Sequence, residues 1–125
     1  MRLRFITVEP DELVMEATYS GEAAMPPQHL HPGQAERFEV LDGSMSTRIG
    51  DEERLYEAGE VFDVPVGTPH QMAAQGPTRM RWEVRPALRT AEFFERLYGE
   101  GPDSAREMGE SFFADFTDEF RLAPA

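Results

Sequence analysis

The chain has 125 residues, which suits one globular domain, and it contains no cysteine, which excludes disulfides and thiolate metal ligands. It carries 24 acidic and 12 basic residues, a formal net charge of −12, and every basic residue is arginine. Such an acidic chain repels nucleic-acid phosphates and anionic membranes. The first ten residues contain no apolar stretch of signal-peptide length, and proline and glycine break the longest uncharged stretches. We therefore expect a soluble, cytoplasmic protein.

The larger, N-terminal part of the chain predicts short β-strands separated by turns. Alternating or β-rich segments predict strands over residues 2–9, 12–19, 36–41, 44–49, 53–58, 61–64, 70–75 and 78–85. Asp42-Gly43 and Gly50-Asp51 mark hairpin turns, and the stretch 65–69 marks another turn. Short strands at close intervals with glycine and proline turns are typical of a β-sandwich or a small barrel.

The apolar period changes to that of a helix after Pro86. Residues 90–98 place four apolar side chains on one helical face, with Thr90 as the expected N-cap, and residues 104–107 resemble a capping box. Most of the nine phenylalanines lie in this tail, at positions 93, 94, 112, 113, 116 and 120. We expect a β-barrel domain over 1–89 and a helical tail over 90–125. The tail packs on the barrel, or part of its aromatic stripe seals a dimer or caps a pocket.

All three histidines fall where their side chains can meet. His29 and His31 have strand spacing, so both rings project from the same face. Glu36 opens the next strand, and His70 follows the turn at 65–69. Two imidazoles and a carboxylate on one sheet face can form three corners of a divalent-metal site, which His70 can close. The spacing leaves open the alternative that the first two histidines lie on a polar surface without a metal.

Two segments carry a resemblance to a known family. Residues 29–43, H-L-H-P-G-Q-A-E-R-F-E-V-L-D-G, resemble the first motif of the cupin family, G-x5-H-x-H-x3,4-E-x6-G. Residues 59–70 resemble the second cupin motif, G-x5-P-x-G-x2-H-x3-N. Two positions depart from the motifs, because the leading glycine is Ala23 and the terminal asparagine is Ala74. The resemblance covers roughly residues 12–86.

The resemblance implies an all-β fold, an antiparallel jelly-roll β-barrel with a short C-terminal helical extension. It also implies one divalent transition metal per chain (Fe, Mn, Ni, Cu or Zn), with His29, His31, Glu36 and His70 as ligands. Glu36 is also the expected catalytic residue. Gln34 has two interpretations, a hydrogen-bond partner of Glu36 or a solvent-facing turn residue. The alternative to a metal centre is a metal-free cupin whose histidines line a cavity. Many cupins are dimers, so we expect a homodimer.

Strand parity extends the site into a predicted substrate pocket. If Glu36 and His70 point inward, the residues two and four positions further along their strands do so as well, as do the apolar positions of 78–85. The predicted pocket residues are Met15, Tyr19, Phe38, Val40, Met45, Thr47, Met72, Met80 and Trp82. The alternative for Trp82 and the methionines is a barrel interior filled with side chains.

The predicted pocket is apolar and aromatic. It favours a small, apolar or aromatic substrate that chelates the metal through one or two oxygen atoms. A chain without lysine, whose arginines fall mostly on outward positions, disfavours phosphorylated sugars and nucleotide sugars. The resemblance therefore implies a small-molecule dioxygenase, similar to quercetinase-like cupins. Two alternatives stay open: a metal-dependent isomerase or lyase, and a non-enzymatic cupin that binds or senses a small ligand.

Overall fold

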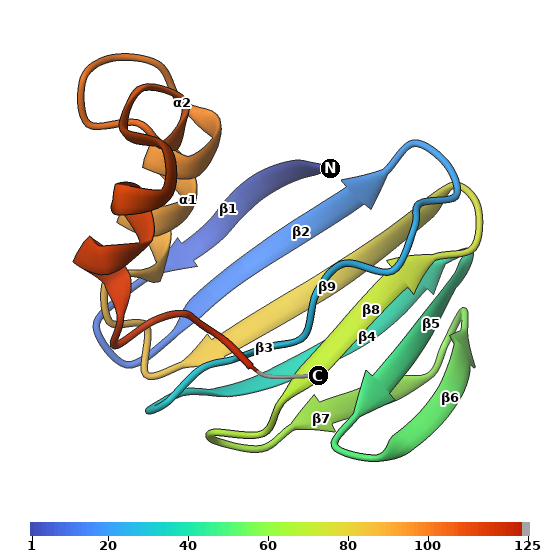
Figure 1. Cartoon of the computed structure of the whole chain (residues 1–125). Helices are drawn as coiled ribbons and strands as arrows, with labels where there is room; N and C mark the ends of the chain where they lie inside the picture. The colour runs from blue at the N-terminus through green and yellow to red at the C-terminus, as the bar shows by residue number, and fades with distance from the viewer. Residues whose placement is uncertain (124–125) are drawn as a thin grey trace.

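Two antiparallel sheets face each other in this computed structural model, which describes residues 1–123 (Figure 1). The first sheet has the order β1 (Arg2–Val8), β2 (Leu13–Tyr19), β9 (Thr78–Arg85), β4 (Ala35–Asp42) and β7 (Val61–Val64). The second has the order β10 (Arg121–Leu122), β3 (His29–Leu30), β8 (His70–Ala74), β5 (Ser44–Ile49) and β6 (Glu52–Glu57). Helices α1 (Thr90–Tyr98) and α2 (Ala105–Met108) and the 3₁₀ helix η1 (Gly109–Phe116) lie at one end of the sheets.

The predicted jelly-roll β-barrel is observed as a sandwich of two separate sheets. Within residues 1–123, every strand pairs only with strands of its own sheet. The predicted antiparallel β-architecture is confirmed, and each predicted strand agrees with an observed one to within one residue at either end. The hairpin between β4 and β5 depends on Gly43, because a side chain there would collide with the Pro77 carbonyl and the backbone has a φ of 85°.

Alternating strand residues build the core between the sheets. On β4, Phe38 and Val40 are buried, whereas Arg37 faces outward and pairs with Asp63 on β7. Helical phenylalanines extend this core into the tail: Phe93, Phe94, Phe112 and Phe116 are buried and belong to the same apolar cluster as the strand residues. The tail therefore packs on the sandwich.

The helical tail differs in detail from its prediction. Thr90 is not an N-cap, because Arg89 precedes the helix and Thr90 is its first residue. The predicted cap at Ser104 is present, since its side chain accepts a hydrogen bond from the Glu107 amide. The second helix is a single α-turn that continues as η1, and the chain then returns as β10, which no sequence pattern indicated.

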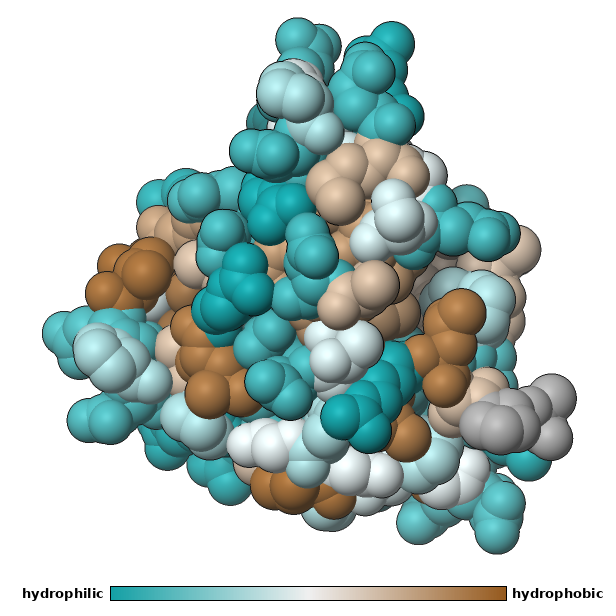
Figure 2. Space-filling view, turned by 60° about the vertical axis from the view of Figure 1, so that its left-hand side comes forward, coloured by the Kyte–Doolittle hydropathy of each residue, from teal (hydrophilic) through white to brown (hydrophobic). Residues whose placement is uncertain are grey.

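The helical end has a mostly hydrophilic outer surface. Figure 2 turns this end toward the viewer and shows hydrophilic residues over most of the face, with apolar residues in separate small patches. None of the helices within residues 1–123 is long and apolar enough to cross a membrane.

Candidate metal centre

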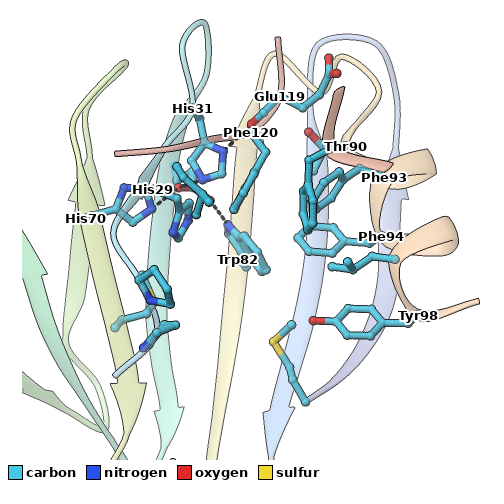
Figure 3. A pocket seen from close by; sticks show the side chains of 18 of the residues that line it. His29, His31, His70, Trp82, Thr90, Phe93, Phe94, Tyr98, Glu119 and Phe120 are labelled. Carbon is cyan, nitrogen blue, oxygen red and sulfur yellow. Dashed lines mark hydrogen bonds and ion pairs between the residues drawn. The ribbon is translucent and has the colours of Figure 1, made fainter. Parts of the chain in front are cut away.

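Three histidines from two neighbouring strands converge at the end of the sandwich that the helices cover (Figure 3). His29 begins β3, His31 lies directly beyond β3, and His70 begins β8. The antiparallel pairing of β3 with β8 places His29 opposite His70. One ring nitrogen from each histidine lies within 4.8 Å of the others. These three side chains are therefore positioned to bind a metal ion.

Glu36 on β4 faces two of these histidines from the opposite sheet. Its Oε1 lies 3.0 Å from His31 Nε2 and 3.2 Å from His70 Nε2. Its Oε2 accepts a hydrogen bond of 2.6 Å from Trp82 Nε1. Although His31 Nε2 and Glu36 Oε1 are close, both are buried without a hydrogen bond of acceptable geometry within the described residues. Buried polar atoms without partners are uncommon, and an imidazole nitrogen and a carboxylate oxygen are atoms of the kinds that bind metals, so the donor set fits a metal ion.

Burial and mutual contact set the protonation of this group. Burial raises the pKa of Glu36, but the contacts with His31 and His70 outweigh burial and lower it to about 2. Burial, reinforced by the two neighbouring imidazoles, lowers the pKa of His29 to about 3. Burial also lowers the pKa of His31, but its contacts with Glu36 and the Glu119 carbonyl outweigh burial and raise it. At neutral pH the site thus holds an ionised carboxylate and a neutral His29, the forms that ligate metals.

Backbone carbonyls orient two of the rings. His31 Nδ1 lies 2.6 Å from the Glu119 carbonyl oxygen, and His70 Nδ1 lies 2.9 Å from the Thr68 carbonyl oxygen. Because a carbonyl oxygen can only accept, each ring carries a proton on Nδ1 and directs Nε2 toward Glu36. In the same way, the Trp82 indole fixes the Glu36 carboxylate. The ligand atoms are therefore held in place by a surrounding layer of hydrogen bonds.

An apolar cavity of about 390 Å³ lies beside the four candidate ligands. Eight aromatic side chains from the first sheet and the tail line it: Tyr19, Phe38, Trp82, Phe93, Phe94, Tyr98, Phe113 and Phe120. Within the described residues, no arginine lines this cavity. Such a wall suits a small apolar or aromatic molecule.

The structure divides the predicted pocket residues into two groups. Tyr19, Phe38, Met72 and Trp82 line the cavity beside the histidines. Five others lie outside it, in the buried core: Met15, Val40, Met45, Thr47 and Met80. These five face the interior, as strand parity predicts, but their part of the sandwich is filled by close packing and leaves no room for a ligand.

Gln34 takes neither of the positions expected of it. Its side chain is buried, and its Nε2 donates to the carbonyl oxygens of Pro86 and Ala87 at 2.9 and 3.0 Å. The same nitrogen lies 2.7 Å from Thr90 Oγ1. Gln34 therefore anchors the start of α1, and it neither faces solvent nor hydrogen-bonds to Glu36.

The aromatic tail caps the cavity, one of the roles considered for it. Most cavity residues that strand patterning missed come from the tail: Thr90, Phe93, Phe94, Leu97, Tyr98, Phe113, Glu119, Phe120 and Leu122. The others are Met1, Pro26 and Pro27. Helical spacing of the phenylalanines predicted an apolar face. It did not indicate that this face meets the histidines, because that contact depends on how the tail folds back.

Comparisons with known proteins agree with this geometry. Residues 15–84 match the family model of the cupin domain. An RmlC-like cupin from Shewanella frigidimarina has a TM-score of 0.64 and 16% identity, and the match covers 71% of this chain and 78% of that one. KdgF from Halomonas sp. has a TM-score of 0.62 and 19% identity, with 67% and 76% covered. A putative ethanolamine utilization protein Q from Salmonella typhimurium has a TM-score of 0.59 and 22% identity, with 68% of each chain covered.

At these identities the likeness to solved structures shows a shared fold and nothing more about activity. A search of curated proteins gave no match. The family model, however, spans more than half of the chain and includes all four candidate metal ligands. The chain therefore belongs to the cupin family.

Proposed function

We propose that this cupin is a metal-dependent enzyme, a dioxygenase that acts on a small, apolar or aromatic substrate with metal-chelating oxygen atoms. The observation that carries the proposal is the position of the histidine and carboxylate donors, which border an aromatic-walled cavity that no arginine lines within the described residues. An isomerase or lyase of phosphorylated sugars needs cationic side chains near the substrate phosphate, and this wall offers none.

The proposed ligands of one divalent metal per chain are His29, His31, Glu36 and His70. A bound redox-active metal would supply Lewis acidity toward substrate oxygens and a place for O₂. The protein's own part is to hold the substrate ring between aromatic side chains such as Phe38 and Phe120 and to keep water away from it.

Glu36 has a second proposed task, as the catalytic residue. Its Oε1 has no hydrogen-bond partner within the described residues, whereas its Oε2 is held by Trp82. Glu36 Oε1 is thus the oxygen proposed to bind the metal and, when it is not coordinated, to accept the proton that a substrate hydroxyl releases as it binds as an anion. The indole hydrogen bond would keep the carboxylate in this orientation during the transfer.

Elemental analysis of tag-free protein purified without chelator tests the proposal first. About one iron, manganese, nickel or copper per chain, with oxygen uptake on a catechol, enol or flavonol, supports a dioxygenase. Firmly bound zinc without oxygen uptake would move the assignment to a metal-dependent isomerase or lyase. If the protein binds no metal, even after reconstitution, the proposal of a metal-dependent enzyme is overturned, and the alternative is a cupin that binds or senses a small ligand.

The variant His31→Ala tests the ligand set. We expect it to lose most of its metal while its circular dichroism spectrum stays that of the parent, because the His31 ring does not belong to the apolar core cluster. Gln71→Ala is the matched control, since Gln71 neighbours His70 on β8 but bonds to the Pro26 carbonyl and does not line the cavity. Unchanged metal content in His31→Ala would show that the ligands are assigned wrongly.

We also propose that the chain forms a homodimer, and that it is cytoplasmic, as its sequence predicts. The outer edge of β1 is unpaired within the described residues, and the strand exposes Ile6 and Val8. An unpaired edge strand with exposed apolar side chains is open to pairing with a second copy. A monomeric mass by analytical ultracentrifugation at micromolar concentration would contradict the dimer.

A further inference from the structure

The chain returns from its helices to the metal centre in a short segment, residues 119–123, which we name the return segment (Figure 1). Within it, β10 pairs with β3, so that Leu122 lies opposite His29. The Ala123 amide donates a hydrogen bond of 2.9 Å to the Gln28 carbonyl. The return segment lies outside residues 15–84, which the cupin family model matches. The family match therefore says nothing about this segment.

The return segment contacts two of the three histidines directly. The Glu119 carbonyl oxygen lies 2.6 Å from His31 Nδ1. The Phe120 ring stacks on His29, with centroids 4.9 Å apart and an interplanar angle of 21°. Figure 3 shows Phe120 beside His29 and His31, with Glu119 next to the His31 ring. Each contact restricts a ring that the metal needs in one orientation.

The position of the Glu119 carbonyl is itself fixed by the buried aromatic cluster. The Glu119 and Phe120 amides both donate to the Phe116 carbonyl, at 3.0 and 2.8 Å. Phe116 is fully buried against Phe93 and Phe112. The helical tail thus delivers the carbonyl to His31 on a rigid support.

We propose that the return segment completes the metal centre, with Glu119 and Phe120 as positioning residues for His31 and His29. The carbonyl keeps the His31 proton on Nδ1, and Phe120 limits rotation of His29. Because such supports hold a ligand in its binding orientation, they raise metal affinity. Thermodynamic linkage then requires that metal binding stabilise the docked return segment to the same extent. The inference rests on the proposed function only in requiring that a divalent metal bind the histidines.

Two full-length variants test the contribution of Phe120. Phe120→Ala removes the ring on His29, and Phe113→Ala is the matched control. Both rings line the cavity, and they lie 5.5 Å apart, but the aromatic contacts of Phe113 within residues 1–123 are only with other phenylalanines. Zinc affinity is measured by competition with a chromogenic chelator. We expect Phe120→Ala to weaken zinc binding about tenfold or more, and Phe113→Ala to change it by less than about twofold.

Amide hydrogen exchange of the parent protein gives a second readout that needs no variant to fold. We expect zinc to slow exchange of the Ala123 amide, which holds the return segment against β3. Equal zinc affinity of Phe120→Ala and the parent, or an Ala123 amide that zinc does not protect, would overturn the inference while leaving a metal-binding cupin. A parent protein that binds no metal at all would overturn the metal centre and this inference together.

Discussion

Glu36 shows at the scale of one residue how the site tolerates a buried charge. A buried carboxylate is costly unless charged or hydrogen-bonding partners surround it. Trp82 donates one hydrogen bond to Glu36. The second favourable contact is with His31, whose pKa is raised by its contact with the Glu36 carboxylate. In the protein without metal, the Glu36 carboxylate and the His31 imidazole each favour the charged form of the other, so a proton on His31 competes with a metal ion.

Competition between this proton and the metal gives the first prediction. The pKa of His31 lies above its ordinary value, so His31 is the ligand that protonates at higher pH than a free histidine, whereas His29, with a pKa of about 3, does not compete. We expect zinc affinity to fall as the pH is lowered from about 8 to about 6, by about tenfold per pH unit for each displaced proton.

Chelator competition at several pH values measures this slope, and the proton release on zinc binding can be followed in weakly buffered solution. Gln71→Ala should follow the parent slope, because its side chain lies outside the cavity. A zinc affinity that stays constant between about pH 8 and about pH 6 would refute the placement of His31 in the ligand set.

At the scale of elements, one buried amide joins the tail to the sandwich. Gln34 lies directly before β4, and its Nε2 donates hydrogen bonds to the carbonyl oxygens of Pro86 and Ala87 and to Thr90 Oγ1. Pro86 and Ala87 belong to the connection between β9 and α1, and Thr90 is the first residue of α1. Ala87 and Thr90 are buried together with Gln34. Gln34, for which the sequence left open a partner of Glu36 or a solvent-facing turn residue, instead anchors the start of the first helix.

Gln34→Ala should therefore destabilise the protein by about 1–3 kcal/mol, because it removes the hydrogen bonds of the buried amide to the Pro86 and Ala87 carbonyls and to Thr90 Oγ1. Urea unfolding of the metal-free protein measures the free energy of unfolding. Gln75→Ala is the control, since Gln75 is exposed and makes one long hydrogen bond of 3.4 Å to the Ala73 carbonyl, so its loss should cost less than about 0.5 kcal/mol. Equal effects of the two substitutions would mean that the Gln34 amide does not anchor α1.

The elements also show what sequence patterns can predict. Strands such as β9 were predicted because seven or eight residues of alternating polarity fix both the type and the face of a strand. The strand β10 was not predicted, since two residues carry no period, and its pairing with β3 depends on the path of the whole tail. The apolar period of the second helical segment was visible, but its 3₁₀ geometry was not.

At the scale of the whole molecule, the candidate ligands were predictable and the extent of the cavity was not. The cupin motifs identified His29, His31, Glu36 and His70 because each sits at a fixed spacing from a turn or a strand start. Strand parity put Phe38 and Met80 on inward faces alike, yet only Phe38 reaches the cavity. Strand parity predicts which face of a strand a side chain occupies. It does not predict where along the strand the close-packed core ends and the cavity begins, because the tail forms part of the cavity wall.

The sandwich and the tail share one apolar core, so the last prediction concerns the unfolding of the whole chain. Because buried phenylalanines of the tail belong to the same cluster as the strand residues, sandwich and tail should unfold together in one cooperative transition. Trp82, the single tryptophan, contacts both Glu36 and Phe94, so its fluorescence reports the site and the tail, while far-ultraviolet circular dichroism reports the sheets. We expect the two signals to coincide on heating.

Zinc at a hundredfold excess over its Kd should raise the common Tm by roughly 10 °C, the equivalent of about 2.7 kcal/mol. A fluorescence transition that precedes the loss of strand signal would show that the tail unfolds independently, and a Tm that chelator does not lower would show that no metal stabilises the fold.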